Sequence, residues 1–358
     1  MEHLYLVTGA NGHLGYTLCQ MLRDQAKHVR GLILPKDDPK RLQALGVDVY
    51  LGDVTKPETL LDFFKLEDTH FSQEKLVLIH TAGIVSISQR KNPWIESVNV
   101  GGTKHLIQLA FEHHIGLMIY VSSVHAIPEK THGLFMHETR SFDPDLVIGN
   151  YAKSKALASK HVIEAIEQGL PAIIVHPSGI IGPEDQGHGH MTMMIEDYLN
   201  GKLTSRINGV YDFVDVRDVA KGILLAIEKG TVGETYLLSG AQIQLKELFE
   251  LLKKYSGKKH SIHVLPRWFA KISAPLAELY YRIRHLPPIY SSYSLYTLSS
   301  NSLFDHTKAT KELGYHTRPI EETIQDTMLW LAHANRVKKI NIKAFIVNML
   351  PMKKIRDK

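Results

Sequence analysis

A tyrosine and a lysine stand four residues apart in the run from Asn150 to Lys155. On a helix this spacing places Tyr151 and Lys155 on one face, where both can act on one substrate. A tyrosine phenol titrates at about 10 in isolation. A neighbouring lysine cation favours the phenolate, so we expect Lys155 to lower the pKa of Tyr151 towards the range useful for proton transfer. The alternative is an exposed Tyr and Lys on an ordinary helix surface.

A pair of serines follows an apolar run over 117–121, which predicts a buried strand. A hydroxyl at the end of that strand can hold the oxygen of a substrate on which Tyr151 acts. We expect Ser123 to do so. Ser122 is the alternative, because the sequence does not rank adjacent serines. The position of the Tyr–Lys pair after this strand end favours the catalytic interpretation of all three groups.

A glycine-spaced turn follows the first apolar strand, over 4–8, and a helical pattern begins at Leu14. Gly9 lets the chain reverse, Gly12 lets the backbone approach a pyrophosphate, and Gly15 lets the helix pack close to the strand. The start of that helix directs free N–H groups and its positive dipole end at the phosphates. The cofactor-binding residues expected here are Gly9, Asn11, Gly12, His13, Leu14 and Gly15.

The end of the second strand, expected over 28–34, bears on the choice of dinucleotide. A carboxylate at this position binds the ribose hydroxyls of NAD, whereas a cation pairs with the 2′-phosphate of NADP. A leucine and a proline take the carboxylate position, and Lys36 and Arg41 follow. We therefore expect NADP. Asp37 and Asp38 keep NAD as the alternative.

Further strands are expected over 47–51 and 76–79, and a long amphipathic segment over 94–114. Asp53 and Val54 come directly after the first of these strands, where the carboxylate can accept a hydrogen bond from an adenine amino group. Small residues after the second strand let a cofactor lie across the strand ends: Thr81, Ala82 and Gly83. Short apolar strands alternating with helical stretches indicate a Rossmann-type, doubly wound parallel α/β sheet.

Composition limits the remaining possibilities. The chain has 358 residues, one cysteine and a formal net charge of +5. Residues 336–358 carry eight Lys or Arg and one Asp, an excess of +7, which leaves −2 for the rest of the chain. The basic charge belongs to the tail, so we expect no nucleic-acid partner. No apolar run approaches the ~18 to 20 residues that span a bilayer, and we expect a cytoplasmic protein.

These motifs together resemble the extended branch of the short-chain dehydrogenase/reductase superfamily, the NAD-dependent epimerase/dehydratase family. Within it, the chain is most similar to the dihydroflavonol reductase and 3β-hydroxysteroid dehydrogenase group. The resemblance covers residues 3 to about 332 and rests on the following motifs: Thr8–Gly15, Gly52-Asp53, His80–Gly83, Asn99–Thr103, Tyr120–Ser123, Tyr151–Lys155, His176–Gly179 and Phe213–Asp218. One departure is His176, where relatives commonly have Arg.

The resemblance implies a role for each matching residue. Tyr151 would donate or accept the proton, Lys155 would bind the nicotinamide ribose and tune the tyrosine, and Ser123 would hydrogen-bond the reacting oxygen. Asn99 would fix neighbouring backbone groups. Residues that would pass beside the nicotinamide are Pro177, Ser178 and Gly179. Relatives are often dimers, so a homodimer is a further expectation.

The domains implied are a dinucleotide-binding domain over 1–180, to which 210–240 returns, a smaller C-terminal substrate lobe over 181–332, and a basic amphipathic tail over 333–358. The stretch 266–281 is rich in large apolar residues and either closes over a flat apolar substrate or forms the core of the lobe. The tail offers peripheral membrane contact. We expect no metal site, because His188 and His190 have no ligand partner at suitable spacing.

The function expected is an NAD(P)(H)-dependent oxidoreductase that interconverts a ketone or aldehyde and its alcohol, with a small-molecule carbonyl or alcohol as its partner. The enzyme alternative is a nucleotide-sugar epimerase or dehydratase that retains NAD, because the same fold supports both reactions. A nonenzymatic NADP-binding sensor is disfavoured, since such relatives usually lack the Tyr–Lys pair.

Overall fold

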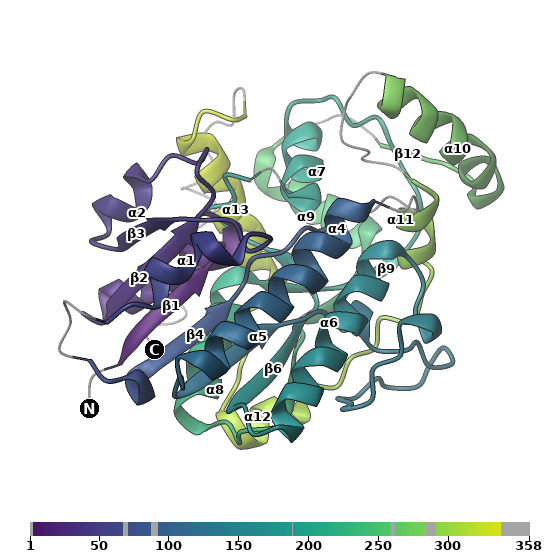
Figure 1. Ribbon diagram of the computed structural model, residues 1–358. Helices are drawn as coiled ribbons and strands as arrows, with labels where there is room; N and C mark the ends of the chain where they lie inside the picture. Colours follow the sequence, from purple (N-terminus) through teal and green to yellow (C-terminus); the bar gives the residue numbers. More distant parts are fainter. Residues whose placement is uncertain are drawn as a thin grey trace.

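The computed structural model describes residues 3–66, 71–86, 92–187, 189–258, 262–283 and 291–337 of the chain. Seven parallel strands form one sheet in the order β10-β6-β5-β4-β1-β2-β3 (Figure 1). Their bounds are β1 Leu4–Thr8, β2 His28–Ile33, β3 Asp48–Leu51, β4 Leu76–His80, β5 Leu117–Val121, β6 Ala172–Pro177 and β10 Thr235–Leu238. The chain winds from β1 to one edge, returns to β4 beside β1 and continues to the other edge. The predicted Rossmann-type fold class is confirmed.

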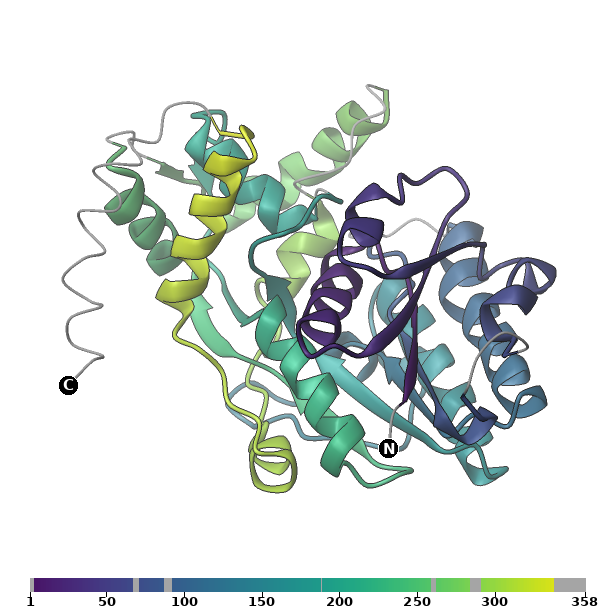
Figure 2. The same ribbon diagram turned by 90° about the vertical axis from the view of Figure 1, so that its left-hand side faces the viewer.

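Helices cover both faces of this sheet, so its strand residues enter two cores alternately. In β4, Leu76 and Leu78 join the core that α5 (Gly102–Glu112) and α6 (Asn150–Glu167) cover. Val77 and Ile79 join the core on the opposite face. There α1 (His13–Asp24) and α8 (Val216–Lys229) lie side by side (Figure 2), and α12 (Thr307–Leu313) packs beside α8. Burial on both faces explains the unbroken apolar runs of the sequence.

Three short helices complete this part of the fold: α2 Lys40–Ala44, α3 Leu61–Phe64 and α4 Pro93–Glu96. The long segment expected over 94–114 is interrupted. A π-helical turn, η3 (Ser97–Gly101), separates α4 from α5. Short 3₁₀ turns lie at Pro57–Thr59, Gln73–Lys75, Val124–Ala126 and Pro144–Leu146.

A second, smaller sheet has the order β11-β9-β7 and lies with a third core. Its strands are β7 Gly179–Ile181, β9 Val210–Asp215 and β11 Ala241–Gln244, and its helices are α7 His190–Leu199, α9 Leu245–Ser256 and α13 Ile320–His333. Two-residue strands β8 (Ser205–Arg206) and β12 (His263–Val264) pair beside it. Helices α10 (Arg267–Ile283) and α11 (Ser292–Thr297) follow. From segment 210–240, α8 and β10 therefore join the large sheet, whereas β9 pairs within the small one.

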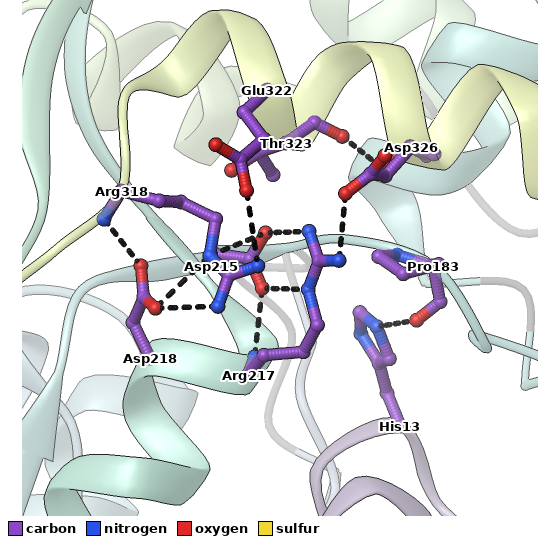
Figure 3. Close-up of polar contacts among 10 residues, drawn as sticks. His13, Pro183, Asp215, Arg217, Asp218, Arg318, Glu322, Thr323 and Asp326 are labelled. Atoms are coloured by element: carbon purple, nitrogen blue, oxygen red, sulfur yellow. Dashed lines mark hydrogen bonds and ion pairs between the residues drawn. The ribbon is translucent and has the colours of Figure 1, made fainter. Parts of the chain in front are cut away.

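A network of charged side chains ties α8 to α13 (Figure 3). The Arg217 guanidinium donates to Asp215 at 2.7 Å and to Asp326 of α13 at 2.6 Å. Arg318, just before α13, donates to Asp218 at 2.8 Å. Burial opposes ionisation of Asp215, but its hydrogen bonds to Arg217 hold its pKa below the usual range. Because these partners come from both parts of the chain, the network fixes the small lobe against the large sheet.

The described large apolar side chains of segment 266–281 lie outside the core of the lobe. Of the α10 side chains that the structure describes, Ala270 and Ala274 are buried, whereas Trp268, Ile272 and Leu276 are exposed. Of the tail, residues 338–358 lie outside the described residues, so the expectation of membrane contact through the tail is not addressed by the structure. No helix in the described part of the chain combines the length and the apolar character that spanning a membrane requires.

Candidate active site

The predicted catalytic tyrosine and lysine lie in the first turns of α6, and both are buried. Gly149 precedes the helix with φ +102°, a left-handed conformation that disfavours other residues. A Cβ at this glycine would lie 2.3 Å from the ring of Tyr293, so the helix begins in close contact with α11. This contact places the start of α6, and Tyr151 with it, against an aromatic side chain of the lobe.

The structure separates the two serines. The Ser122 hydroxyl turns into the core and lies 2.7 Å from the hydroxyl of Ser159 in α6. Ser123 accepts a hydrogen bond from the His125 backbone at 3.2 Å, and its side chain is close enough to Tyr151 to lower the pKa of the phenol. Ser123 is therefore the serine that faces the tyrosine.

Tyr151 and Lys155 differ from the expected electrostatic pair. Burial raises the pKa of Tyr151 above its ordinary value, and the neighbouring Ser123 side chain offsets only part of that rise. The Lys155 ammonium donates to the backbone carbonyl of Val121 at 2.8 Å and lies 5.1 Å from the centre of the Tyr120 ring. Burial lowers the pKa of Lys155 to about 8. The expected lowering of the Tyr151 pKa is not found, because desolvation dominates and the lysine is hydrogen-bonded to the end of β5.

Asn99 lies in the π-helical turn and connects backbone to α6. Its side-chain oxygen accepts from the Ile84 N–H at 2.8 Å, and its amide donates to the Ile84 carbonyl and, at 2.9 Å, to Ser154. Ser154 adjoins Lys155 in the sequence, so Asn99 ties the loop after β4 to the helix that carries the lysine. Gly83 lies in the same loop, and a Cβ there would lie 3.4 Å from the Lys155 nitrogen.

The glycine turn after β1 is built for close approach of backbone. Gly9 has φ +66°, and its carbonyl accepts from the Gly12 N–H at 2.9 Å. A Cβ at Gly15 would lie 2.2 Å from the Gly9 oxygen, so only glycine lets α1 start this close to the strand. Gly12 precedes α1 without a capping side chain. A phosphate can therefore meet the first N–H groups of the helix, and the turn fits a dinucleotide.

Other residues predicted in this turn are already engaged within the protein. The His13 ring lies 2.8 Å from the Pro183 carbonyl (Figure 3). Burial lowers the pKa of His13, despite opposing effects of Asp185 and others. Leu14 is buried in the core beneath the turn, and the Asn11 amide donates to the Asp38 carbonyl at 3.1 Å. A cofactor would meet Leu14 through its backbone.

The two cations expected after β2 have different surroundings. Lys36 is exposed. The Arg41 guanidinium pairs with Glu184 at 2.6 Å and stacks on Tyr16 at 3.8 Å. Pro183 and Glu184 thus connect the loop after β7 to both the glycine turn and α2. The sequence patterns indicate a loop here but not these contacts, because the contacts join residues more than a hundred positions apart.

Residues predicted near the adenine and after β4 make local contacts. One Asp53 carboxylate oxygen accepts from the backbone and the hydroxyl of Thr55 at 2.9 and 2.8 Å. Val54 packs against Gly102, where a Cβ would lie 2.6 Å from the valine side chain. Thr81 donates to the Thr8 carbonyl at 2.6 Å, and the Ala82 N–H donates to the Thr8 hydroxyl at 3.2 Å. These bonds fix the strand ends beside the turn.

The segment after β6 borders the serine end of the site. The His176 ring lies 3.2 Å from the Ser123 carbonyl, and burial lowers its pKa to about 4, so it is neutral. Pro177 ends β6, and Ser178 beyond it is buried, with no hydrogen-bond partner for its hydroxyl among the described residues. A Cβ at Gly179 would lie 2.7 Å from Tyr211. The departure at His176 therefore places a neutral ring beneath the strand end that bears Ser123.

Three aromatic residues lie near Tyr151: His125 and Tyr211, which the sequence did not indicate, and Tyr293, from the aromatic stretch 290–296 that could close over a flat apolar substrate. The His125 ring lies 6.1 Å from the Tyr151 ring and 2.7 Å from the Tyr211 hydroxyl. The Tyr293 ring lies 6.2 Å from the His125 ring, and its buried hydroxyl has no hydrogen-bond partner. Because His125 follows Ser123 by two residues, its position in the sequence could have indicated that it lies near the site.

A cavity of 260 Å³ opens beside this group. Its lining includes Val124, His125 and Tyr211, and the exposed side chains of Leu146 and Ile148 lie at its rim. A second cavity of 410 Å³ shares Ser300 and Asn301 with it. The described residues contain no group of three His, Cys, Asp or Glu side chains placed to hold a metal ion. His188 lies outside the described residues, and His190 begins α7.

Comparison with known proteins places the chain in a family. The model of the NAD dependent epimerase/dehydratase family matches residues 5–239. Sterol demethylase protein B of Methylococcus capsulatus is 30% identical over 91% of this chain and 97% of that protein. A Stigmatella aurantiaca protein, 4-hydroxy-2-methyl-3-oxo-4-farnesyl-3,4-dihydroquinoline-1-oxide ketoreductase, is 28% identical over 87% and 91%. The crystal structure of gox2253 superposes with a TM-score of 0.80 at 31% identity, covering 94% of this chain and all of that one.

These matches confirm the resemblance and the oxidoreductase class predicted from the sequence. The matched segment contains the glycine turn, Ser123, Tyr151 and Lys155. The chain belongs to the NAD-dependent epimerase/dehydratase family, the extended branch of the short-chain dehydrogenase/reductases.

Proposed function

We propose that this protein uses NADP(H) to interconvert a ketone or aldehyde and its alcohol, with Ser123, Tyr151 and Lys155 as its catalytic residues. The observation that carries the proposal is that Tyr151 and Lys155 lie buried in the first turns of α6, with Ser123, just after β5, close enough to influence the Tyr151 phenol. Ser123 and Tyr151 lie at the carboxyl edge of the sheet beside the cavity lined by His125. The ketoreductase name of one relative supports the same class of reaction.

Proton transfer in this site follows from the side chains. The raised pKa of Tyr151 keeps its phenol protonated at neutral pH, ready to give its proton to a carbonyl oxygen held by the Ser123 hydroxyl. The phenolate left behind would be stabilised by Lys155, which is still mostly a cation at pH 7 with a pKa of about 8. In the reverse direction the phenolate takes the proton of an alcohol. The dinucleotide, when bound, accepts or supplies the hydride.

We propose that the cofactor is held by the glycine turn and by Asp53 and Val54. Three segments at strand ends also contribute: Lys36 after β2, residues 81–83 after β4, and residues 177–179 at the end of β6. NADP is favoured over NAD because Lys36 is an exposed cation after β2. Arg41 contributes less to this preference, since its guanidinium is paired with Glu184. The dissociation constants of NADP and NAD for the wild type and Lys36→Glu test this point. Equal loss of both affinities would contradict a 2′-phosphate contact.

Replacing Tyr151 with Phe tests the catalytic proposal. We expect turnover of a carbonyl panel to fall by about 10²- to 10⁴-fold, with the cofactor dissociation constant unchanged. Tyr198→Phe, at a buried position in the lobe core, is the matched control and retains turnover. If Tyr151→Phe turns over the substrate at a rate close to that of the wild type, Tyr151 does not transfer the proton.

The second candidate is an epimerase or dehydratase, favoured by the family to which the chain belongs. In that class hydride leaves and returns within one catalytic cycle, so the cofactor is retained. Cofactor that stays with the protein through purification, together with no net oxidation of added NADPH, would favour this candidate.

A further inference from the structure

Helix α10 exposes large apolar side chains along one face. At about 100° per residue, seven of these positions fall within an arc of about 120°. Their exposed fractions run from 42% to 68%. The residues are Trp268, Phe269, Ile272, Leu276, Leu279, Tyr280 and Ile283. So large a contiguous apolar surface on a folded protein marks an interaction site.

The opposite face of α10 contacts the rest of the protein through small residues. Ala270 and Ala274 are both fully buried. Two alanines seat the helix on the lobe while its Trp, Ile and Leu side chains point outwards. The helix stands at one end of the molecule, away from the large sheet (Figure 1). Its apolar face is therefore accessible to a flat, extended surface.

The charged side chains of α10 indicate the kind of surface. Arg267 and Lys271 are exposed; at about 100° per residue Lys271 falls about 60° beyond one edge of the apolar arc, and Arg267 falls about 100° beyond the same edge, next to Ala274. The one carboxylate in the sequence of this helix, Glu278, accepts a hydrogen bond from the Ser292 N–H at 2.7 Å. A helix with aromatic and aliphatic residues on one face and cations beside it is suited to the boundary between anionic headgroups and acyl chains.

The cavities connect this helix with the candidate active site. Arg267, the first residue of α10, lines the 410 Å³ cavity. Ser300 and Asn301 line both this cavity and the one that contains His125 and Tyr211. The two cavities therefore adjoin, one at the start of α10 and the other beside His125 and Tyr211.

We propose that α10 docks on the surface of an anionic lipid bilayer, with its apolar face in the acyl boundary and Arg267 and Lys271 at the headgroups. The adjoining cavities then receive a lipophilic carbonyl or alcohol compound from that bilayer. This second part rests on the proposed function, whereas docking itself does not.

Vesicle flotation of the full-length protein tests docking. The probe is phosphatidylcholine vesicles with and without phosphatidylglycerol. The wild type should float with the anionic vesicles, and Ile272→Asp and Leu276→Asp should each weaken partitioning by about tenfold or more, because each places a charge at a position that enters the apolar boundary. Val232→Asp, at an exposed valine outside α10, is the matched control and should bind as the wild type does.

Three outcomes would overturn docking through α10. If the wild-type protein floats with neither kind of vesicle, α10 does not dock on a lipid bilayer. A second outcome is that both aspartate variants float as the wild type does, whereas a full-length variant whose lysines at 338, 339, 353 and 354 are replaced by Ser no longer floats. That outcome assigns vesicle binding to the tail. A wild-type dimer that Ile272→Asp converts to a monomer, with no vesicle binding, assigns the face to a second copy of the chain.

Substrate entry is tested separately, with NADPH and either butanal in solution or decanal in anionic vesicles. Ile272→Asp should leave kcat/KM for butanal unchanged and lower the apparent kcat/KM for decanal by about the same factor as vesicle partitioning. Equal rates on decanal would overturn delivery from the bilayer. No turnover of either aldehyde by a wild type that floats normally would count against the proposed function and leave docking intact.

Discussion

Removal of the Lys155 charge should stabilise the cofactor-free protein by an amount that depends on pH. Burial lowers the pKa of this lysine from 10.5 to about 8. One pKa unit corresponds to about 1.4 kcal/mol, so the buried cation costs the folded state about 3 kcal/mol below pH 8. Lys155→Met removes that cost and keeps most of the side-chain volume.

The sign of the pH dependence follows from proton binding. Between pH 8 and pH 10.5 the unfolded chain keeps the proton of Lys155 while the folded protein has lost it, so wild-type stability rises with pH in this window. Above pH 10.5 both states are neutral and the cost is gone. The advantage of Lys155→Met over the wild type should therefore shrink by about 2–3 kcal/mol from pH 7 to pH 10.

The assay is urea unfolding of both proteins at one-unit steps from pH 7 to pH 10. Lys160→Met, at an exposed position of α6, is the control and should run parallel to the wild type. His80 and His176, whose pKa values Lys155 helps to lower, titrate at about 3 and about 4 and stay outside the window. A constant difference between Lys155→Met and the wild type would refute a buried, partly desolvated ammonium group.

The remaining predictions concern the geometry of the site. Ser123→Ala should lower kcat by about 10²- to 10³-fold, whereas Ser122→Ala should affect mainly stability; steady-state rates that reverse this order would reassign the serines. Gly15→Ala should cost about 1–3 kcal/mol or more of stability and abolish NADP binding by calorimetry, because its Cβ meets the Gly9 carbonyl at 2.2 Å. Tyr293→Phe removes a hydroxyl with no hydrogen-bond partner; thermal unfolding should show equal or higher stability, and a KM that does not rise would exclude this hydroxyl from substrate binding.

The sequence predicted the sheet well because its strands are buried on both faces. Five-residue apolar runs such as 117–121 stand out against helical segments, and their order matches a parallel α/β fold. The interruption at Asn99 was not predictable, because a π-helical turn depends on where its amide can reach Ile84 and Ser154.

The sequence predicted only those features of the candidate site that depend on residues close together in the chain. Tyr151 and Lys155 share a helix, so their proximity follows from the sequence. The choice of Ser123 over Ser122 depended on the direction of each side chain at a strand end. The raised pKa of Tyr151 depended on burial by residues from other elements. The pairing of Arg41 with Glu184 joins positions 143 residues apart, and no local pattern indicates it.

Transfer of deuteride from NADPH labelled at the nicotinamide C4 tests the central claim most directly. A carbonyl substrate found in the panel is incubated with the enzyme, and the product is analysed by mass spectrometry. The account predicts one deuterium on the carbinol carbon for each NADPH oxidised, lost together with turnover in Tyr151→Phe. Product formed without net NADPH oxidation, or label absent from that carbon, would contradict it.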